Sequence, residues 1–169
     1  ASYEAVSRCN SMLRTAVTAF DKGEITAEEL EWFTNQARVL RGFYHFEAWR
    51  MWANRTTNTG VPFVAEDHDQ ATLTNTEDIR DLIIADLLAG TNLPNDMGQI
   101  GRFNKTVAQV LAAKAYMQMY NDYTSALPLL AAAENGTNPI GTPVGLETYY
   151  GDIFDASNRN GVEAVYTVQ

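Results

Sequence analysis

Two arginines, Arg38 and Arg41, lie three residues apart in a stretch that is otherwise rich in large apolar side chains. A buried guanidinium is costly unless it is paired, so an ordinary amphipathic helix would rarely carry two. We expect each guanidinium to hold a carboxylate or loop carbonyls through its fixed fork of donors. Binding of an anionic ligand by the pair is the alternative.

A second candidate site lies at the end of the same helical stretch, where Trp52 is followed closely by Asn54, Arg55 and Asn58. Aromatic faces stack on pyranose rings, and planar polar groups of this kind hydrogen-bond to hydroxyls. The four residues are therefore predicted to contact a glycan or a partner. An ordinary exposed loop is the alternative.

Arg102 and Lys105 stand at the start of a later helical segment, where positive charge opposes the local helix dipole. Such charges are tolerated if they hold a neighbouring carboxylate or a chain end, and we expect this structural role. A phosphate site is the alternative, because helix N-termini accept anions.

The acidic run Glu66-Asp67-His68-Asp69 could form a loose calcium site. An EF-hand loop needs oxygen ligands at alternate positions, but Ala71 and Leu73 occupy places where such ligands are required. We therefore expect a solvated acidic loop, with a weak calcium site involving Glu77 and Asp78 as the alternative.

Zinc, a cofactor and catalysis have little support in the sequence. The only histidines, His45 and His68, lie on separate elements, and no suitably spaced cysteine or histidine accompanies them. There is no Gly-x-Ser-x-Gly, no phosphate-binding loop and no cysteine–histidine constellation. We expect a protein that is not an enzyme and that has no cofactor and no metal.

The composition excludes some partners. A net charge of −9 with only 12 Lys and Arg disfavours binding to nucleic acid or to an anionic membrane surface. No run approaches the roughly 20 apolar residues of a membrane span. The single cysteine, Cys9, has no apolar signal segment before it, so it is interpreted as a buried helix thiol rather than a lipid-attachment site.

Apolar residues at three-and-four spacing predict an all-α fold. The expected helices are 3–21, 26–52, 74–88, 105–120 and 123–134. Thr26 with Glu29, and Thr74 with Glu77, are read as capping boxes that open the second and third of them. On the second helix, Phe33, Leu40, Phe43 and Tyr44 are predicted to face the core. Residues 61–64 are expected to be extended, and 163–169 to form a closing strand.

Two helices joined by a short turn, with alanines at their crossing, are typical of tetratricopeptide-like hairpins. The segment from Asp122 onward fits the second helix of such a repeat, with Ala126, Leu130 and Ala133 at three-and-four spacing. We therefore expect tetratricopeptide-like helical hairpins that form an α-α superhelix, with a short extended segment at the C-terminal end. A plain helical bundle is the alternative.

Seven short motifs stand in one order along almost the whole chain. They are Gln36-Ala-Arg-Val-Leu-Arg41, Gly60-Val61-Pro62, Ile83-Ile84-x-Asp86-Leu87 with Leu93-Pro94, Gly101-Arg102-x-x-Lys105 with Ala115-Tyr116, Asp122-Tyr123-x-x-Ala126, Tyr150-x-x-Ile153-Phe154, and Glu163-x-Val165-Tyr166-x-Val168-Gln169. The series resembles the motifs of the SusD/RagB family, the nutrient-binding lipoproteins of Bacteroidetes surface uptake systems.

The chain departs from the family pattern at three places. Gln36 replaces a glutamate, which removes one ion-pair partner for Arg38 or Arg41 from the motif. Gly42 replaces an alanine and costs about 0.5–1 kcal/mol of helix stability. The loop over residues 53–59 is longer than usual. These departures indicate a divergent member.

The resemblance implies a protein of the polysaccharide-utilisation type, anchored by lipid to the cell outer membrane and exposed at the surface. It implies capture of an oligosaccharide, or of a peptide in the RagB branch, for import through a SusC-like TonB-dependent transporter. It implies binding without catalysis. Membrane contact would be made only through a lipid anchor outside these residues.

Residues 1–169 are therefore expected to be a single helical-repeat region of a longer protein. The signal and lipid-anchor segment and the C-terminal part, with most of the ligand site, would lie outside it. A free-standing tetratricopeptide-like adaptor that binds a protein or peptide is the alternative function.

Overall fold

The computed structural model describes residues 2–68 and 72–167. Its elements in chain order are α1 (Ser2–Asp21), α2 (Ala27–Trp52), α3 (Arg80–Ala89), η2 (Gly90–Asn92), α4 (Lys105–Ala115), η3 (Tyr116–Tyr120), α5 (Tyr123–Glu134), η4 (Tyr150–Phe154) and η5 (Ala156–Asn158). Isolated β-bridges are the only strand pairing in the described ranges. The expected all-α architecture built from helical hairpins is confirmed.

The sequence was interpreted as one helical-repeat region, and the structure divides it into two compact units, Ala1–Ala89 and Gly90–Gln169. Among the residues that the structure describes, no helix is long and apolar enough to cross a membrane.

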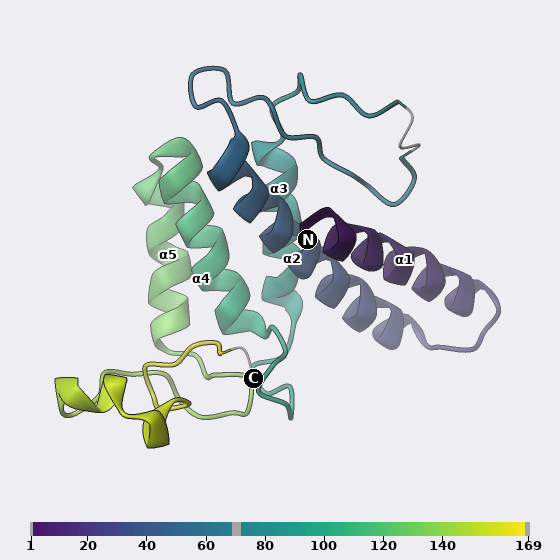
Figure 1. Cartoon of the computed structure of the whole chain (residues 1–169). Coiled ribbons are helices and arrows are strands. Elements are labelled where there is room, and N and C mark those ends of the chain that lie inside the picture. Colours follow the sequence, from purple (N-terminus) through teal and green to yellow (C-terminus); the bar gives the residue numbers. More distant parts are fainter. Residues whose placement is uncertain (1, 69–71, 168–169) are drawn as a thin grey trace. The chain divides into compact units, whose positions relative to one another are not determined.

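In the first unit, α1 and α2 pack as an antiparallel hairpin (Figure 1). The buried face of α1 carries Val6, Cys9, Leu13 and Ala16, which follow the three-and-four spacing of its sequence. Burial raises the pKa of the Cys9 thiol to about 11, so the thiol stays protonated. The interpretation of Cys9 as a buried helix thiol is confirmed.

The start of α2 is the predicted capping box. Thr26 accepts a hydrogen bond from the backbone N–H of Glu29 at 3.2 Å, and the Glu29 carboxylate accepts from the backbone N–H of Thr26 at 2.8 Å. The two bonds satisfy two N–H groups that the first turn of a helix leaves without helical partners. A polar tetrapeptide thus fixes where the longest helix of the chain begins.

The core face of α2 differs from the prediction. The residues expected to face inward, Phe33, Leu40, Phe43 and Tyr44, are only half-buried. The fully buried apolar residues are instead Val39, Phe46, Ala48 and Trp49. The reason is that α2 packs against both α1 and α3, and α3 lies against the side of α2 that carries Gly42.

The predicted start of α3 was wrong. The helix begins at Arg80 rather than at Thr74, because the side chain of Asp78 accepts from the backbone N–H of Arg80 at 3.1 Å. The backbone carbonyl of Asn75 is used elsewhere and accepts from the N–H of Gly60 at 2.7 Å. Leu82 is exposed, whereas Ile83 is fully buried.

In the second unit, α4 and α5 form an antiparallel pair (Figure 1). Asn104 caps α4 by accepting from the N–H of Val107 at 2.9 Å, and its amide group also donates to the carbonyls of Asn95 and Thr137. Ala108 and Ala112 are fully buried, which is how small side chains permit close helix contact. Asp122 caps α5 by accepting from the N–H of Ser125 at 3.0 Å.

The expected closing strand is not formed over the part of it that the structure describes. Residues 163–167 are turns and irregular backbone, and the other two residues of the prediction, Val168 and Gln169, lie outside the described residues. Tyr166 instead packs edge-to-face on Phe103, with ring centroids 4.7 Å apart. A single strand has no partner for its ladder hydrogen bonds, so ring packing holds this segment in place.

Gly42→Ala is predicted to destabilise the first unit by about 1–2 kcal/mol, although alanine is the better helix former. A methyl group at this position would lie 3.0 Å from Asp86 Cβ and 3.0 Å from the backbone nitrogen of Leu87. Urea unfolding followed by tryptophan fluorescence measures the effect, because Trp32, Trp49 and Trp52 all lie in α2.

Gly151→Ala, which lies in the second unit and is followed by far-UV circular dichroism, is the control for the added methyl group. The added methyl group meets nothing within 4 Å, so no loss of stability is expected there. A Gly42→Ala protein as stable as the unmodified chain would contradict the close contact between α2 and α3.

Candidate ligand-binding site and its arginine cluster

Arg38 and Arg41 both contact one buried carboxylate, that of Asp86 on α3. Arg41 donates two hydrogen bonds to this carboxylate, from Nε to Oδ2 at 2.6 Å and from Nη2 to Oδ1 at 3.0 Å. Arg38 adds a bond from its Nε to Oδ1 at 3.0 Å, and donates to the carbonyl of Ala85. A bidentate guanidinium–carboxylate pair of this kind fixes orientation as well as charge.

Arg41 also reaches two other segments. Its Nη1 donates to Oδ1 of Asn10 on α1 at 2.9 Å, and it forms an ion pair with Glu66, which lies between α2 and α3. We call Arg38, Arg41, Asp86, Glu66 and Asn10 the arginine cluster. One side chain of α2 thereby ties α1, the segment around Glu66 and α3 to a single point.

The charges of the arginine cluster balance, with two guanidiniums against two carboxylates. Burial by itself would lower the pKa of Arg41, but hydrogen bonds to Asp86 and Glu66 and the charges of those groups outweigh it and raise the pKa. For Glu66, the bond and charge of Arg41 overcome the effect of burial and lower the pKa. Arg41 and Glu66 are therefore ionised, and the pairing of their charges makes burial tolerable.

The two departures in the arginine motif have a structural explanation. The expected glutamate is absent at Gln36, and the carboxylates come instead from Asp86 and Glu66, which are distant in sequence. Gly42 lies directly against Asp86 and Leu87, where a side chain would crowd them. The glycine thus allows α3 to approach closely enough for Asp86 to lie beneath both arginines.

Residues 61–68, here called the connecting segment, are held against α2 by His45. The ring nitrogen Nδ1 lies 3.0 Å from the carbonyl of Arg41, and Nε2 accepts from the N–H of Val64 at 3.1 Å. This pair of bonds defines the neutral tautomer with its proton on Nδ1. The ring also stacks on Phe63, with centroids 4.4 Å apart. Burial lowers the pKa of His45 to about 4.

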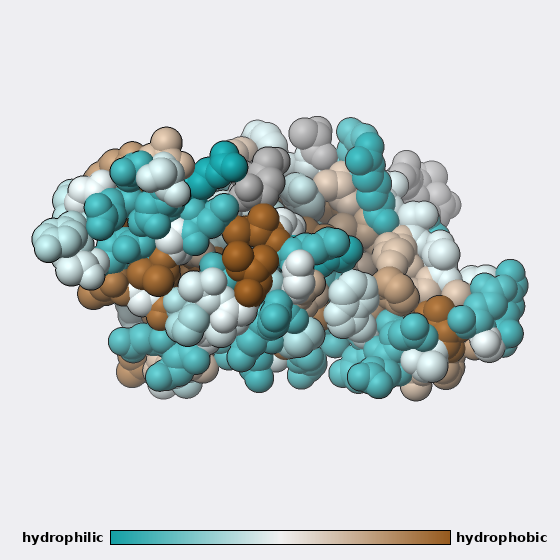
Figure 2. Space-filling model, turned by 90° about the horizontal axis from the view of Figure 1, so that it is seen from below, coloured by the Kyte–Doolittle hydropathy of each residue, from teal (hydrophilic) through white to brown (hydrophobic). Residues whose placement is uncertain are grey.

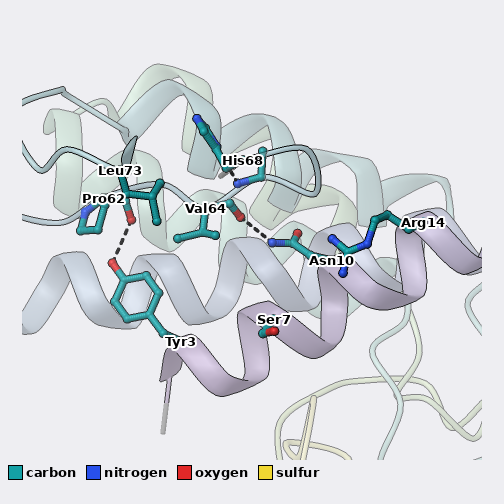
Figure 3. Close-up of a pocket in the computed structure, with 9 residues that line it drawn as sticks. Tyr3, Ser7, Asn10, Arg14, Pro62, Val64, His68 and Leu73 are labelled. Atoms are coloured by element: carbon teal, nitrogen blue, oxygen red, sulfur yellow. Dashed lines mark hydrogen bonds between the residues drawn. The ribbon is translucent and has the colours of Figure 1, made fainter. Parts of the chain in front are cut away.

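A cavity of about 380 Å³ lies between α1 and a wall formed by residues 62–68 together with Leu73. Its lining residues are Tyr3, Ser7, Asn10, Arg14, Pro62, Val64, Ala65, His68 and Leu73. Figure 3 shows two hydrogen bonds that close its sides, Tyr3 hydroxyl to the carbonyl of Pro62 and Asn10 amide to the carbonyl of Val64, both 2.8 Å. Sequence reasoning missed this cavity, because its two walls are more than 50 residues apart.

The four predicted glycan contacts lie together on the loop of residues 52–60, here called the Trp52 loop. The loop is closed by a bridge between Asn54 and Thr59, and Asn58 takes a left-handed conformation with φ of 57°. The Trp52 side chain is 62% exposed. Arg55 is turned back onto α2, 3.9 Å above the ring of Trp49. An exposed indole is therefore carried by the same short loop as Asn54 and Asn58, and Arg55 supports the loop.

Arg102 and Lys105 lie at the start of α4, as expected. The Nε of Arg102 donates to the side-chain oxygen of Gln99 at 2.8 Å. The backbone N–H of Lys105 donates to the carbonyl of Pro94, and its side chain is exposed. Both the structural role and the phosphate site stay predictions.

The acidic run at residues 66–69 is partly committed to other contacts. Glu66 belongs to the arginine cluster, and His68 Nδ1 accepts from the N–H of Ala65 at 3.1 Å. Asp69 lies outside the described residues. Within the described parts of the chain, no group of three or more histidine, cysteine, aspartate or glutamate side chains could hold a metal ion.

Several solved structures share this fold over nearly the whole chain. A laminarin-binding SusD-like protein matches with a TM-score of 0.77 at 21% identity over 98% of the chain, and a SusD-like protein from Bacteroides fragilis with 0.74 at 20% over 99%. A protein solved with a xylogluco-oligosaccharide matches with 0.70 at 22% over 98%. These matches confirm the resemblance drawn from the motifs: the chain has the SusD-like helical fold.

The chain corresponds to a part of these proteins. It spans 35%, 32% and 33% of their respective lengths, which is about one third. No family model matches the sequence, and no curated protein matches it. The likeness is therefore one of structure, carried by sequence identities of 20–22%.

Asp86→Asn is predicted to destabilise the first unit by about 3–5 kcal/mol, because it leaves two guanidiniums around a neutral amide. Asp78→Asn is the matched control, since that carboxylate is partly exposed and pairs with Arg80 on the surface. Its expected cost is about 0–1 kcal/mol. Urea unfolding of both variants gives the comparison, and equal costs would contradict a special role for Asp86.

His45 is predicted to stay neutral down to about pH 4 in the folded protein. The unfolded chain takes up a proton near pH 6.5, so stability is lost as the pH falls from 6.5 to 4, by about 3 kcal/mol in total. Titration of His45 by NMR tests this directly. A His45 that titrates near pH 6.5 would be incompatible with its two hydrogen bonds.

Proposed function

We propose that this chain is the helical part of a longer cell-surface protein that captures oligosaccharides for import. The observation that carries the proposal is the SusD-like fold over 98% of the chain, shared with a laminarin-binding protein. In the proposed system, a lipid anchor holds the protein at the outer membrane and a SusC-like TonB-dependent transporter is its partner. The protein binds its ligand and does not catalyse a reaction.

The structural neighbours support carbohydrate as the ligand class. One is a laminarin-binding SusD-like protein, and another was solved with a xylogluco-oligosaccharide. The seven motifs lie in the same order along the chain and support the same origin. Because the chain spans about a third of these neighbours, we propose that further ligand contacts come from parts of the protein outside these residues.

The Trp52 loop is the proposed sugar contact within this chain. The exposed indole of Trp52 offers an apolar face to a pyranose ring, and the nearby Asn54 and Asn58 carry amide groups that can bond to hydroxyls. Arg55 stacks on Trp49 and donates to the carbonyl of Arg50 at 2.9 Å, which holds the loop against α2. The loop is therefore ordered before a ligand arrives, and this lowers the entropic cost of binding.

Exposed apolar residues in the second unit support the proposal that this chain packs against further protein. Leu146, Tyr149, Tyr150 and Phe154 are each more than 70% exposed. On the face of the molecule drawn in Figure 2, brown apolar patches lie among hydrophilic side chains. Large exposed apolar residues in one short segment are typical of a surface that another part of a protein covers.

Trp52→Ala is predicted to weaken binding of laminarihexaose at least tenfold, because the stacking face is lost. Met51→Ala is the matched control, since Met51 is equally exposed and adjacent but has no ring. NMR of the indole N–H groups during titration shows whether Trp52 responds while buried Trp49 does not.

Two outcomes would count against this function. If neither laminarihexaose nor a xyloglucan oligosaccharide shifts the Trp52 signal, the Trp52 loop is not a sugar site. If unmodified peptides bind to the chain and neither glycan binds, the function of a tetratricopeptide-like adaptor is favoured over sugar capture.

A further inference from the structure

The cavity beside α1 has a lining of unusual charge for this chain. The protein carries 21 Asp and Glu against 12 Lys and Arg, yet no carboxylate side chain is among the described residues that line the cavity. Its one permanently charged group is the guanidinium of Arg14. A guanidinium among lining residues that carry no carboxylate, within the part of the chain that the structure describes, favours an anionic ligand over a neutral one.

The polar groups that line the cavity include several hydrogen-bond donors. Arg14 uses its Nη1 to donate to the carbonyl of Glu66 at 2.8 Å, and a guanidinium has five N–H donors in all. His68 accepts from the N–H of Ala65 through Nδ1, so the neutral ring carries its proton on Nε2. Ser7 adds a hydroxyl. A set of donors around one space suits a carboxylate, which only accepts.

The cavity also has apolar lining. Pro62, Val64 and Leu73 contribute to it on the same wall as His68, and Figure 3 shows the ring of Tyr3 next to the carbonyl of Pro62. A ligand that suits this lining combines a carboxylate with an apolar face on its body. A volume of about 380 Å³ lies within the usual size range of small-molecule sites.

The cavity walls are fixed by the arginine cluster. Asn10 donates to the carbonyl of Val64 on one side and accepts from Arg41 on the other. The N–H of Val64 is held by His45. Both walls are thus connected to α2 through buried or part-buried hydrogen bonds, and the cavity is formed before a ligand arrives.

We propose that this cavity binds the carboxylate of an acidic sugar, a uronic acid residue of the captured glycan, with Arg14, Ser7 and His68 as the donors. The choice of a sugar acid rests on the proposed carbohydrate function. The choice of a carboxylate rests on the donors and on the charge of the lining. The cavity is a second contact, separate from the Trp52 loop.

Methyl β-D-glucuronide is the probe, and methyl β-D-glucoside, which lacks the carboxylate, is its neutral match. Titration into the ¹⁵N-labelled chain, followed by NMR, is expected to shift the amide signals of Ser7, Asn10 and Val64. The glucuronide should bind at least tenfold more tightly than the glucoside. Arg14→Met should remove most of this preference, and Ser7→Ala should weaken binding two- to fivefold.

Arg8→Met is the matched control, because Arg8 lies on the same helix but is exposed and pairs with Glu4. It should leave binding of the glucuronide unchanged. Unchanged signals of His45 and Phe46 in the Arg14→Met protein show that the fold is retained.

Three results would overturn the proposal: equal binding of glucoside and glucuronide, shifts that map away from the cavity, or no shift at all. Tighter binding of N-acetyl-alanine would assign the cavity to a peptide carboxylate instead. If laminarihexaose does not bind at Trp52 but the glucuronide binds in the cavity, only the proposed binding of neutral glucans is contradicted. If laminarihexaose binds at Trp52 but the glucuronide does not bind in the cavity, only the present proposal is contradicted.

Discussion

The first unit depends on one buried interaction, the bidentate ion pair between Arg41 and Asp86. Removal of two charges from water costs several kcal/mol for each ion, and only a complete set of partners offsets this cost. Asp86, Glu66 and Asn10 supply that set from three different segments. Once these partners are in place, α1, α3 and the connecting segment each have a defined position against α2.

The same interaction explains features that lie outside the cluster itself. The position of α3 favours a glycine at residue 42, since a Cβ there would crowd Asp86 and the backbone of Leu87. The connecting segment, held by Glu66 and His45, forms one wall of the cavity, and Asn10 links that wall to α1. The donors of the cavity are therefore placed by contacts that do not themselves face the ligand.

Local signals in the sequence predicted most of the helices but fewer of their contacts. The N-terminal starts of α2 and α5 follow from Thr26 and Asp122, because capping is decided by neighbours within four residues. The start of α3 was missed because Asp78 satisfies the first turn and makes Thr74 unnecessary. Asp86 was noted as part of a motif, but nothing in its neighbourhood predicts a partner 45 residues earlier. The cavity was not predicted from the sequence for the same reason, since its walls come together only when the chain folds.

Hydrogen exchange at the backbone amide of Val64 tests the central claim most directly. This amide belongs to the connecting segment and is bonded to His45, whose own acceptor is the carbonyl of Arg41. In an Arg41→Lys protein the charge is kept, but a single ammonium cannot reach three partners as the guanidinium fork does. The account predicts that Val64 exchanges at least tenfold faster in this variant, while Ala112 of the second unit is unaffected. Unchanged exchange at Val64 would show that Arg41 does not hold the segment.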